Sequence, residues 1–142
     1  MPTGRFKYEK LTKYPHLKPE DILTWEKFID LVPAAYDSVD YDFALGQVPE
    51  ATTKAQELEI PGAEKVFRYK ADVIGYAPER IDIIELKDKA NPTAIGQTLS
   101  EKMLYDRDEK PTVPTRAVII AREATPELHE IADKYGVRLI LV

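Results

Sequence analysis

The feature that most constrains this chain is a pair of apolar, alternating segments, residues 66–76 and 81–87, joined by a short polar stretch that contains proline. This pattern predicts an antiparallel hairpin. If residues 77–80 form a four-residue loop, Tyr76 pairs with Ile81 at the first step of the ladder. The positions of all further partners then follow, because paired residue numbers in an antiparallel ladder have a constant sum.

This register places Asp72 directly opposite Glu85. Lys87 lies on the same face as Glu85, because side chains alternate along a strand. Opposed side chains lie about 4.5–5.5 Å apart, and like charges at that separation repel. Either a shared proton or a cation between the two carboxylates would relieve the repulsion, and a cation is the simpler interpretation because the lysine can then serve the chemistry. The alternative is a strand that leaves the core with its charged residues in water.

The rest of the sequence predicts helices and strands around this hairpin. Proline at the first helical position and acids in the first turn mark the first helix, whose core stripe would be Ile22, Trp25, Ile29 and Val32. The other predicted elements are a strand at 36–45, a loop at 48–64, a helix at 91–107, a strand at 116–121, a helix at 125–135 and a strand at 137–142. We expect a single α/β domain with a central mixed β-sheet flanked by helices.

The hairpin residues read as D-x(12)-E-x-K, from Asp72 to Glu85-Leu86-Lys87. This motif resembles the PD-(D/E)XK nuclease superfamily, and the predicted order of elements matches its α-β-β-β-α-β core, with a C-terminal α-β added. Ala71 stands where the family often has proline. The resemblance implies that Asp72 and Glu85 bind Mg²⁺ or Mn²⁺, that Leu86 supplies a backbone carbonyl, and that Lys87 orients or helps to deprotonate the attacking water. Hard divalent ions do prefer such oxygen ligands.

The same resemblance implies two further site residues, one with an amide side chain and one with a carboxyl group. Gln97, on the helix after the hairpin, resembles the glutamine of RecB-like and NucS-like nucleases that reaches the active site, although Glu101 stands where those proteins usually have a tyrosine. The closing segment 116–140 is similar to NucS-like and archaeal Holliday-junction-resolvase-like nucleases. Glu26 of the first helix is a candidate third acid near the metal. Read alone, Glu26 is an ordinary boundary residue and the polar stripe around Gln97 is a solvated face.

Residues 1–18 form a basic, aromatic N-terminal segment, which we treat as an arm preceding a nuclease-like domain at 19–142. Basic residues interleaved with aromatics suit contact with a nucleic-acid backbone and its exposed bases. The alternative is a tail whose aromatic rings pack on the body while its lysines stay in water. The candidate DNA-binding residues are Arg5, Lys7, Lys10, Lys13, Tyr8 and Tyr14.

Composition limits the chemistry. The 142 residues, 44% hydrophobic, suffice for one core. With no cysteine and only two histidines, thiolate sites are excluded and a histidine-rich metal site is disfavoured, which leaves oxygen ligands and hence Mg²⁺. The net charge of −5 argues against a polyanionic substrate, but the basic segment offsets it locally. No apolar run would span a membrane, and we expect a cytoplasmic protein.

The resemblance therefore implies a Mg²⁺- or Mn²⁺-dependent DNA nuclease, an endonuclease acting on duplex or branched DNA in repair or recombination. A homodimer would suit cleavage of both strands. Two alternatives stay open: a nucleic-acid-binding protein that keeps the fold without catalysis, and a partner-binding protein in which Lys87 neutralises Asp72 and Glu85 in a salt-bridge cluster.

Overall fold

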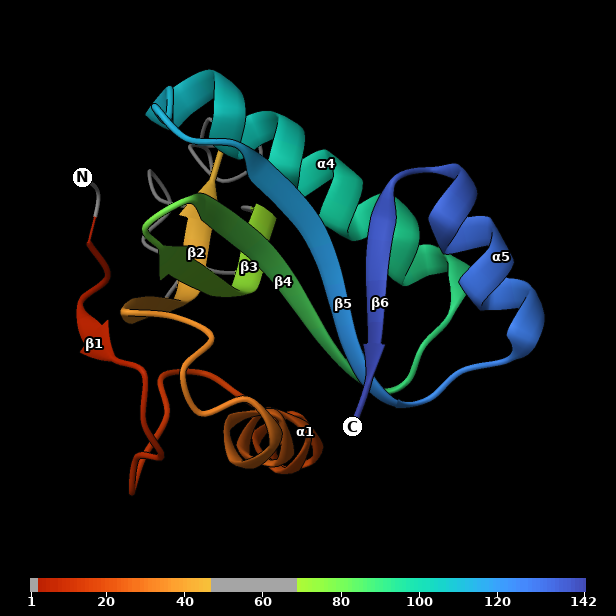
Figure 1. Cartoon of the computed structure of the whole chain (residues 1–142), viewed down its shortest axis with the longest axis horizontal. Coiled ribbons are helices and arrows are strands. Elements are labelled where there is room, and N and C mark those ends of the chain that lie inside the picture. Colours follow the sequence, from red (N-terminus) through yellow and green to blue (C-terminus); the bar gives the residue numbers. More distant parts are fainter. Residues whose placement is uncertain (1–2, 47–68) are drawn as a thin grey trace, which may run out of the picture.

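The computed structural model describes residues 3–46 and 69–142, and within them the chain forms a mixed sheet with helices on both faces (Figure 1). The sheet has the order β1-β2-β3-β4-β5-β6, antiparallel from β1 to β4 and parallel from β4 to β6. The predicted α/β class with a mixed sheet is confirmed. The strands are β1 (Phe6–Lys7), β2 (Ser38–Leu45), β3 (Tyr69–Ala77), β4 (Arg80–Lys89), β5 (Thr115–Glu123) and β6 (Val137–Leu141), and the helices are α1 (Pro19–Leu31), α4 (Pro92–Glu109) and α5 (Pro126–Lys134).

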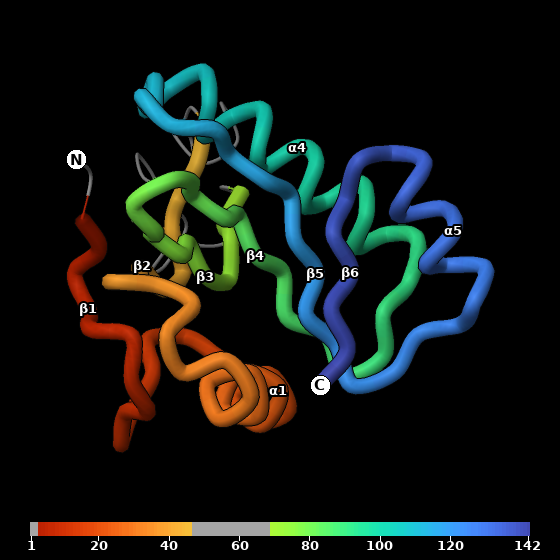
Figure 2. Tube along the Cα trace, viewed as in Figure 1, coloured from red at the N-terminus to blue at the C-terminus, as the bar shows by residue number. Residues whose placement is uncertain are grey.

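The helices divide between the two faces of the sheet. In the backbone trace, α1 lies on one side of the strands, and α4 and α5 lie on the other (Figure 2). Alternate residues of β4 accordingly enter different cores: Ile84 and Leu86 pack with Trp25 of α1, whereas Ile83 packs with Tyr105 of α4. The central strand is thus buried on both sides, as expected where a strand pairs in parallel with its neighbour.

The hairpin has the predicted register but a shorter turn. Tyr76 pairs with Ile81, and the ladder closes further with Ala77 opposite Arg80, so only residues 78–79 form the turn. The predicted four-residue loop is therefore too long by two residues. Closing the ladder by one more pair keeps the sum of residue numbers constant, so the register of every other pair is unchanged.

Helix starts follow the predicted capping signals. The Asn91 side chain accepts a hydrogen bond of 2.9 Å from the Ala94 amide, and Thr125 accepts one of 3.2 Å from the amide of Leu128. The predicted stripe of α1 needs correction: Val32 ends the helix and is exposed, whereas Phe28 is buried. A helix face repeats at three and four residues, so Phe28 completes the stripe after Trp25.

The described part of the N-terminal segment packs on the domain. Phe6 and Lys7 form a short edge strand, not predicted from the sequence, that pairs with Val39 and Ser38. Tyr14 is buried in the core beside α1. The predicted loop at 48–64, and the first residues of the strand predicted to begin at Val66, lie outside the described residues. No helix in residues 3–46 and 69–142 is long and apolar enough to cross a membrane.

Candidate functional site

Three carboxyl groups meet beside the hairpin. Asp72 comes from β3, Glu85 from β4 and Glu101 from α4, and the Glu85 carboxyl group is close enough to each of the other two to shift its pKa. Glu85 and Glu101 are only 4% and 3% exposed. Asp72 Oδ2 also accepts a hydrogen bond of 2.9 Å from the Leu86 amide, which fixes its carboxyl group against β4. The face shared by Asp72 and Glu85 is the one predicted from the hairpin register.

The surroundings of these acids oppose ionisation. Burial, followed by the charge of Glu85, raises the pKa of Asp72 well above the usual range of an aspartate. Burial and then the contact with Glu101 raise the pKa of Glu85 in the same way. Burial raises the pKa of Glu101 to about 7. Without a bound cation, burial and mutual repulsion therefore favour the protonated forms of these carboxyl groups.

An open pocket of about 410 Å³ gives solvent access to Asp72 and Glu85. It lies between the first turn of α1 and the second turn of α4, at the end of the hairpin. Behind it, Glu101 Oε1 is buried and has no hydrogen-bond partner among the described residues. A buried oxygen without a partner is costly and marks an incomplete polar site. The charged and polar residues lining the pocket are Lys18, Glu20, Asp21, Lys70, Asp72, Glu85, Lys87, Asp88, Lys89 and Gln97.

Lys87 and Gln97, two of the predicted site residues, both line this pocket. Lys87 is half-buried, and its ammonium group acts against the raised pKa values of Asp72, Glu85 and Glu101. Gln97 is exposed and precedes Glu101 by one helical turn, so its amide lies at the mouth of the pocket. Amide and ammonium groups here can donate hydrogen bonds to a ligand in the pocket.

Leu86, predicted to contribute its carbonyl, contacts the cluster through its amide. The Leu86 side chain is buried in the core that contacts α1, and its N–H donates to Asp72. The β3–β4 ladder ends at the pair of Val73 and Ile84. The bond from Leu86 fixes Asp72 against β4 just beyond that end. The carbonyl role of Leu86 remains a prediction.

The acid that α1 brings to the pocket is Asp21, whereas the predicted Glu26 does not line it. The Glu26 carboxylate instead accepts a hydrogen bond of 2.8 Å from the Tyr14 hydroxyl. Burial, and then the charges of Asp72 and Glu20, raise the pKa of Asp21 to about 6. The pocket lies at the beginning of α1, so a first-turn acid faces it and an acid in the second turn does not.

The aromatic residues of the N-terminal segment pack against the rest of the domain. The Tyr8 ring packs edge-on against Trp25 and Tyr36, and its hydroxyl donates a 2.6 Å bond to the carbonyl of Val32. This matches the alternative of a packed tail. Lys10 forms an ion pair with Asp30. Arg5, Lys7 and Lys13 are exposed, and their contact with DNA remains a prediction.

The cations nearest the carboxyl cluster were not singled out from the sequence. Lys18, Lys70 and Lys89 line the same pocket as Lys87. Lysines at a strand end resemble ordinary solvated residues in a sequence, and only the fold brings these together. They give the pocket a mixed charge, because acids and lysines line it together.

The donor set suits a hard divalent ion, because it consists of carboxylate oxygens. Among the described residues, however, no group of three or more acidic or histidine side chains is arranged to hold a metal ion. Binding of an ion would have to displace the protons of these carboxyl groups and separate Asp72 from Glu85.

Comparison with known proteins identifies no relative: no family model, no curated protein and no solved structure matches the chain. The resemblance to the PD-(D/E)XK superfamily rests on the motif residues and the order of elements alone.

Proposed function

We propose that the protein is a Mg²⁺- or Mn²⁺-dependent DNA nuclease of the PD-(D/E)XK type. The observation that carries the proposal is that Glu85 interacts with both Asp72 and Glu101, while Asp72, Glu85 and Lys87 line one open pocket. Buried carboxyl groups that face one another destabilise a fold unless a proton or a cation lies between them. A site that keeps such groups next to solvent is better explained by ion binding than by stability.

The proposed reaction is hydrolysis of a phosphodiester, in which water attacks phosphorus and the bond to the leaving oxygen breaks. A divalent ion held by Asp72 and Glu85 would lower the pKa of bound water and offset charge on the phosphoryl oxygens. Lys87 would orient the attacking water or stabilise the charge that develops on the phosphate. Gln97, at the mouth of the same pocket, would hydrogen-bond to the water or to a phosphoryl oxygen.

The remaining ammonium groups support a polyanionic substrate. Lys18, Lys70 and Lys89 lie around the acids in the pocket, where they would contact phosphates on either side of the scissile bond. They make the local surface suitable for DNA in a chain whose net charge is −5. Duplex or branched DNA as substrate, and a role in repair or recombination, extend the same proposal.

The test is cleavage of linear, single-stranded, mismatched and four-way-junction DNA in the presence of Mg²⁺ or Mn²⁺. Glu85→Gln keeps the side-chain shape and removes the charge, and Glu79→Gln, in the exposed turn of the same hairpin, is its matched control. We expect Glu85→Gln to lower the rate by at least about 100-fold, the scale of losing one catalytic group, and Glu79→Gln to leave it unchanged. Equal rates for the two variants would refute the proposal.

A second candidate is a catalytically inactive member of the same fold that binds nucleic acid or a protein partner. It is favoured by the direct contact between the carboxyl groups, which is the arrangement expected if protons bridge them permanently. This candidate predicts no change in melting temperature on addition of Mg²⁺ or Mn²⁺. The nuclease predicts stabilisation, because an ion that binds only the folded state raises its stability.

A further inference from the structure

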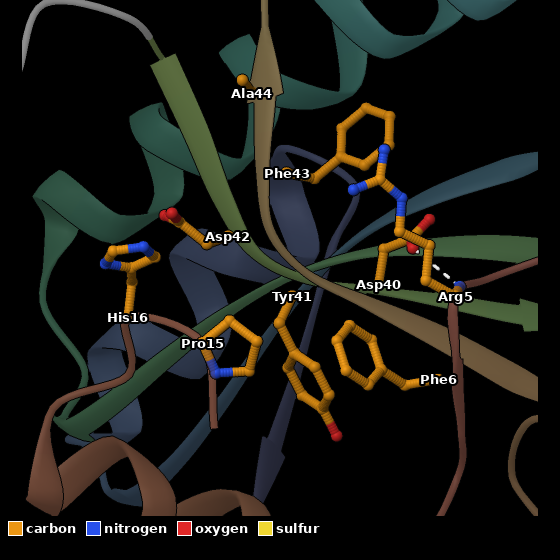
Figure 3. Close-up of a pocket in the computed structure, with 9 residues that line it drawn as sticks. All are labelled: Arg5, Phe6, Pro15, His16, Asp40, Tyr41, Asp42, Phe43 and Ala44. Atoms are coloured by element: carbon orange, nitrogen blue, oxygen red, sulfur yellow. Dashed lines mark hydrogen bonds between the residues drawn. The ribbon is translucent and has the colours of Figure 1, made fainter. Parts of the chain in front are cut away.

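A second pocket, of about 430 Å³, lies between β2 and the N-terminal segment (Figure 3). One wall is Asp40 to Ala44 of β2, and the other is formed by Arg5, Phe6, Pro15 and His16. In the described part of the chain, β1 pairs only with Ser38 and Val39, so residues 40–44 of β2 pair with β3 on one side and have no strand partner on the side of the N-terminal segment. The pocket therefore occupies an open edge of the sheet.

Aromatic rings form the apolar part of this pocket, and neighbouring side chains hold them in place. Phe6 packs edge-on against Tyr41, with ring centroids 5.2 Å apart. The Tyr41 hydroxyl accepts a hydrogen bond of 2.9 Å from the Trp25 indole, and Phe43 packs against Tyr105 at 5.7 Å. Rings already fixed by packing can contact a flat ligand with little further loss of conformational entropy.

Polar groups lie at both ends of the pocket. Arg5 and Phe43 are drawn at one end, and His16 and Asp42 at the other (Figure 3). Asp40 is already occupied, because its carboxylate accepts bonds of 2.9 Å from the Arg5 amide and 2.8 Å from the Tyr76 hydroxyl. Asp42 and Arg5 are therefore the charged side chains best placed to recognise a ligand.

The backbone is strained at the His16 and Asp42 end. His16 has φ 53° and Asp42 has φ 49°, two of the three non-glycine residues with positive φ in the described chain. Residues other than glycine rarely adopt this left-handed backbone conformation, and such strain clusters at binding sites. The two residues come from different segments and lie at the same end of the pocket.

The pocket adjoins the carboxyl cluster. The catalytic pocket is the one lined by Asp72 and Glu85. Lys18 also lines that pocket, and His16, two residues earlier in the chain, lines this one. Across the β2–β3 ladder, Ala44 pairs with Lys70, which also lines the catalytic pocket. A strand of DNA with its phosphate at Asp72 would therefore pass beside this second pocket.

We propose that this pocket receives one unpaired base of the DNA substrate, next to the scissile phosphate. The inference rests on the proposed nuclease function and deepens it. Aromatic rings stack on any base, Asp42 can accept a hydrogen bond from an exocyclic amino group, and Arg5 can contact a base or a phosphate. A base within an intact duplex cannot enter such a pocket without leaving its stack, so the substrate is DNA with an unpaired nucleotide.

The experiment measures binding of a single-stranded oligonucleotide containing 2-aminopurine, and of its fully paired duplex, with Ca²⁺ in place of Mg²⁺. The variants are Asp42→Asn and His16→Asn, because asparagine tolerates the left-handed backbone at both positions. His129→Asn, on the exposed face of α5, is the matched control. Circular dichroism of each variant checks that it is folded.

We expect stacking in the wild-type protein to change the fluorescence of 2-aminopurine. Each pocket variant should weaken binding of the single strand by about five- to tenfold, the scale of one lost base contact, and that of the duplex by less than about twofold. Unchanged affinity in both variants, or an equal loss for single strand and duplex, would overturn the inference. If the wild-type protein cleaves DNA and only this result fails, the nuclease proposal stands; if it neither binds nor cleaves DNA, both fail.

Discussion

Two buried acids on the same strand, Asp82 and Glu85, have opposite surroundings. Asp82 is fully buried and accepts a 2.6 Å bond from the Tyr36 hydroxyl and two bonds of 2.8 Å from the Arg116 guanidinium. Glu85, three residues later on the other face of the sheet, contacts two further carboxyl groups. Burial of an acid is therefore not by itself a sign of function: the presence or absence of partners distinguishes a structural carboxylate from a candidate catalytic one.

The Asp82 region is built to hold its charge. Gly75 pairs with Asp82 across the hairpin, and a Cβ at Gly75 would lie 2.6 Å from the Tyr36 ring. The glycine thus makes room for the ring whose hydroxyl completes the site. In residues 3–46 and 69–142, no hydroxyl or guanidinium group donates a hydrogen bond to Glu85, and the charge of Lys87 favours its ionised form. The first region contributes to the stability of the fold, and the second reduces it in the absence of a cation.

The largest expected effect concerns stability. Asp82→Ala should lower the free energy of unfolding by about 3–5 kcal/mol, because it leaves the Arg116 guanidinium without its buried partner. Glu85→Gln should lower it little or raise it, because it removes a repelling charge. Urea unfolding of both variants measures the difference. A similar loss in both would mean that the two acids have the same structural role.

The next effect concerns Glu101. In the proposed nuclease, Glu101 would position Glu85 for ion binding, because it contacts Glu85 and one of its buried oxygens has no partner among the described residues. Glu101→Ala should weaken Mn²⁺ binding by about 10- to 100-fold, as loss of a residue supporting a metal ligand typically does, and Glu101→Gln should restore part of it. Isothermal titration calorimetry measures the affinity, and Glu109→Ala at the end of α4 is the control. Unchanged Mn²⁺ affinity in Glu101→Ala would remove Glu101 from the site.

The free energy of unfolding should also depend on pH. Most acids have a lowered pKa in the folded state and add stability as pH rises, whereas the acids of this cluster should do the opposite. The folded-state pKa values of Asp72, Glu85 and Glu101 are raised, so the folded protein binds more protons than the unfolded chain above about pH 4. The free energy of unfolding is then highest below the unfolded pKa values and falls as pH rises through the folded ones, by up to about 1.4 kcal/mol per pH unit for each proton.

Urea unfolding in EDTA between about pH 5 and pH 8 measures this decline. Excess Mg²⁺ should make the decline shallower, because the ion replaces the protons of the carboxyl cluster. Glu85→Gln is the matched variant and should also reduce the slope. A free energy of unfolding that rises over this interval in EDTA would show that the carboxyl groups are ionised in the folded protein.

The hairpin could be predicted from the sequence because its information is local. Alternation of apolar residues and a short turn determine the register that brings Asp72 to Glu85. Asn91 and Thr125 likewise mark the starts of their helices, because each side chain accepts a hydrogen bond from the amide three residues later in the chain. Glu101 could not be assigned in this way, because a charged residue on a helix indicates solvent unless the face that covers the sheet is known. The same reasoning applies to the aromatic N-terminal segment, whose packing depends on distant residues.

The smallest expected effect tests which acid of α1 belongs to the site. Glu26 is bonded to Tyr14 away from the pocket, whereas Asp21 lines it and interacts electrostatically with Asp72 and Lys87. Asp21→Asn should weaken Mn²⁺ binding by about two- to fivefold, the effect of one partly screened charge, while Glu26→Gln should leave it unchanged. Calorimetry at two ionic strengths measures both, and the effect of Asp21→Asn should shrink at high salt. An effect of Glu26→Gln alone would mean that α1 presents its second turn, rather than its first, to the ion.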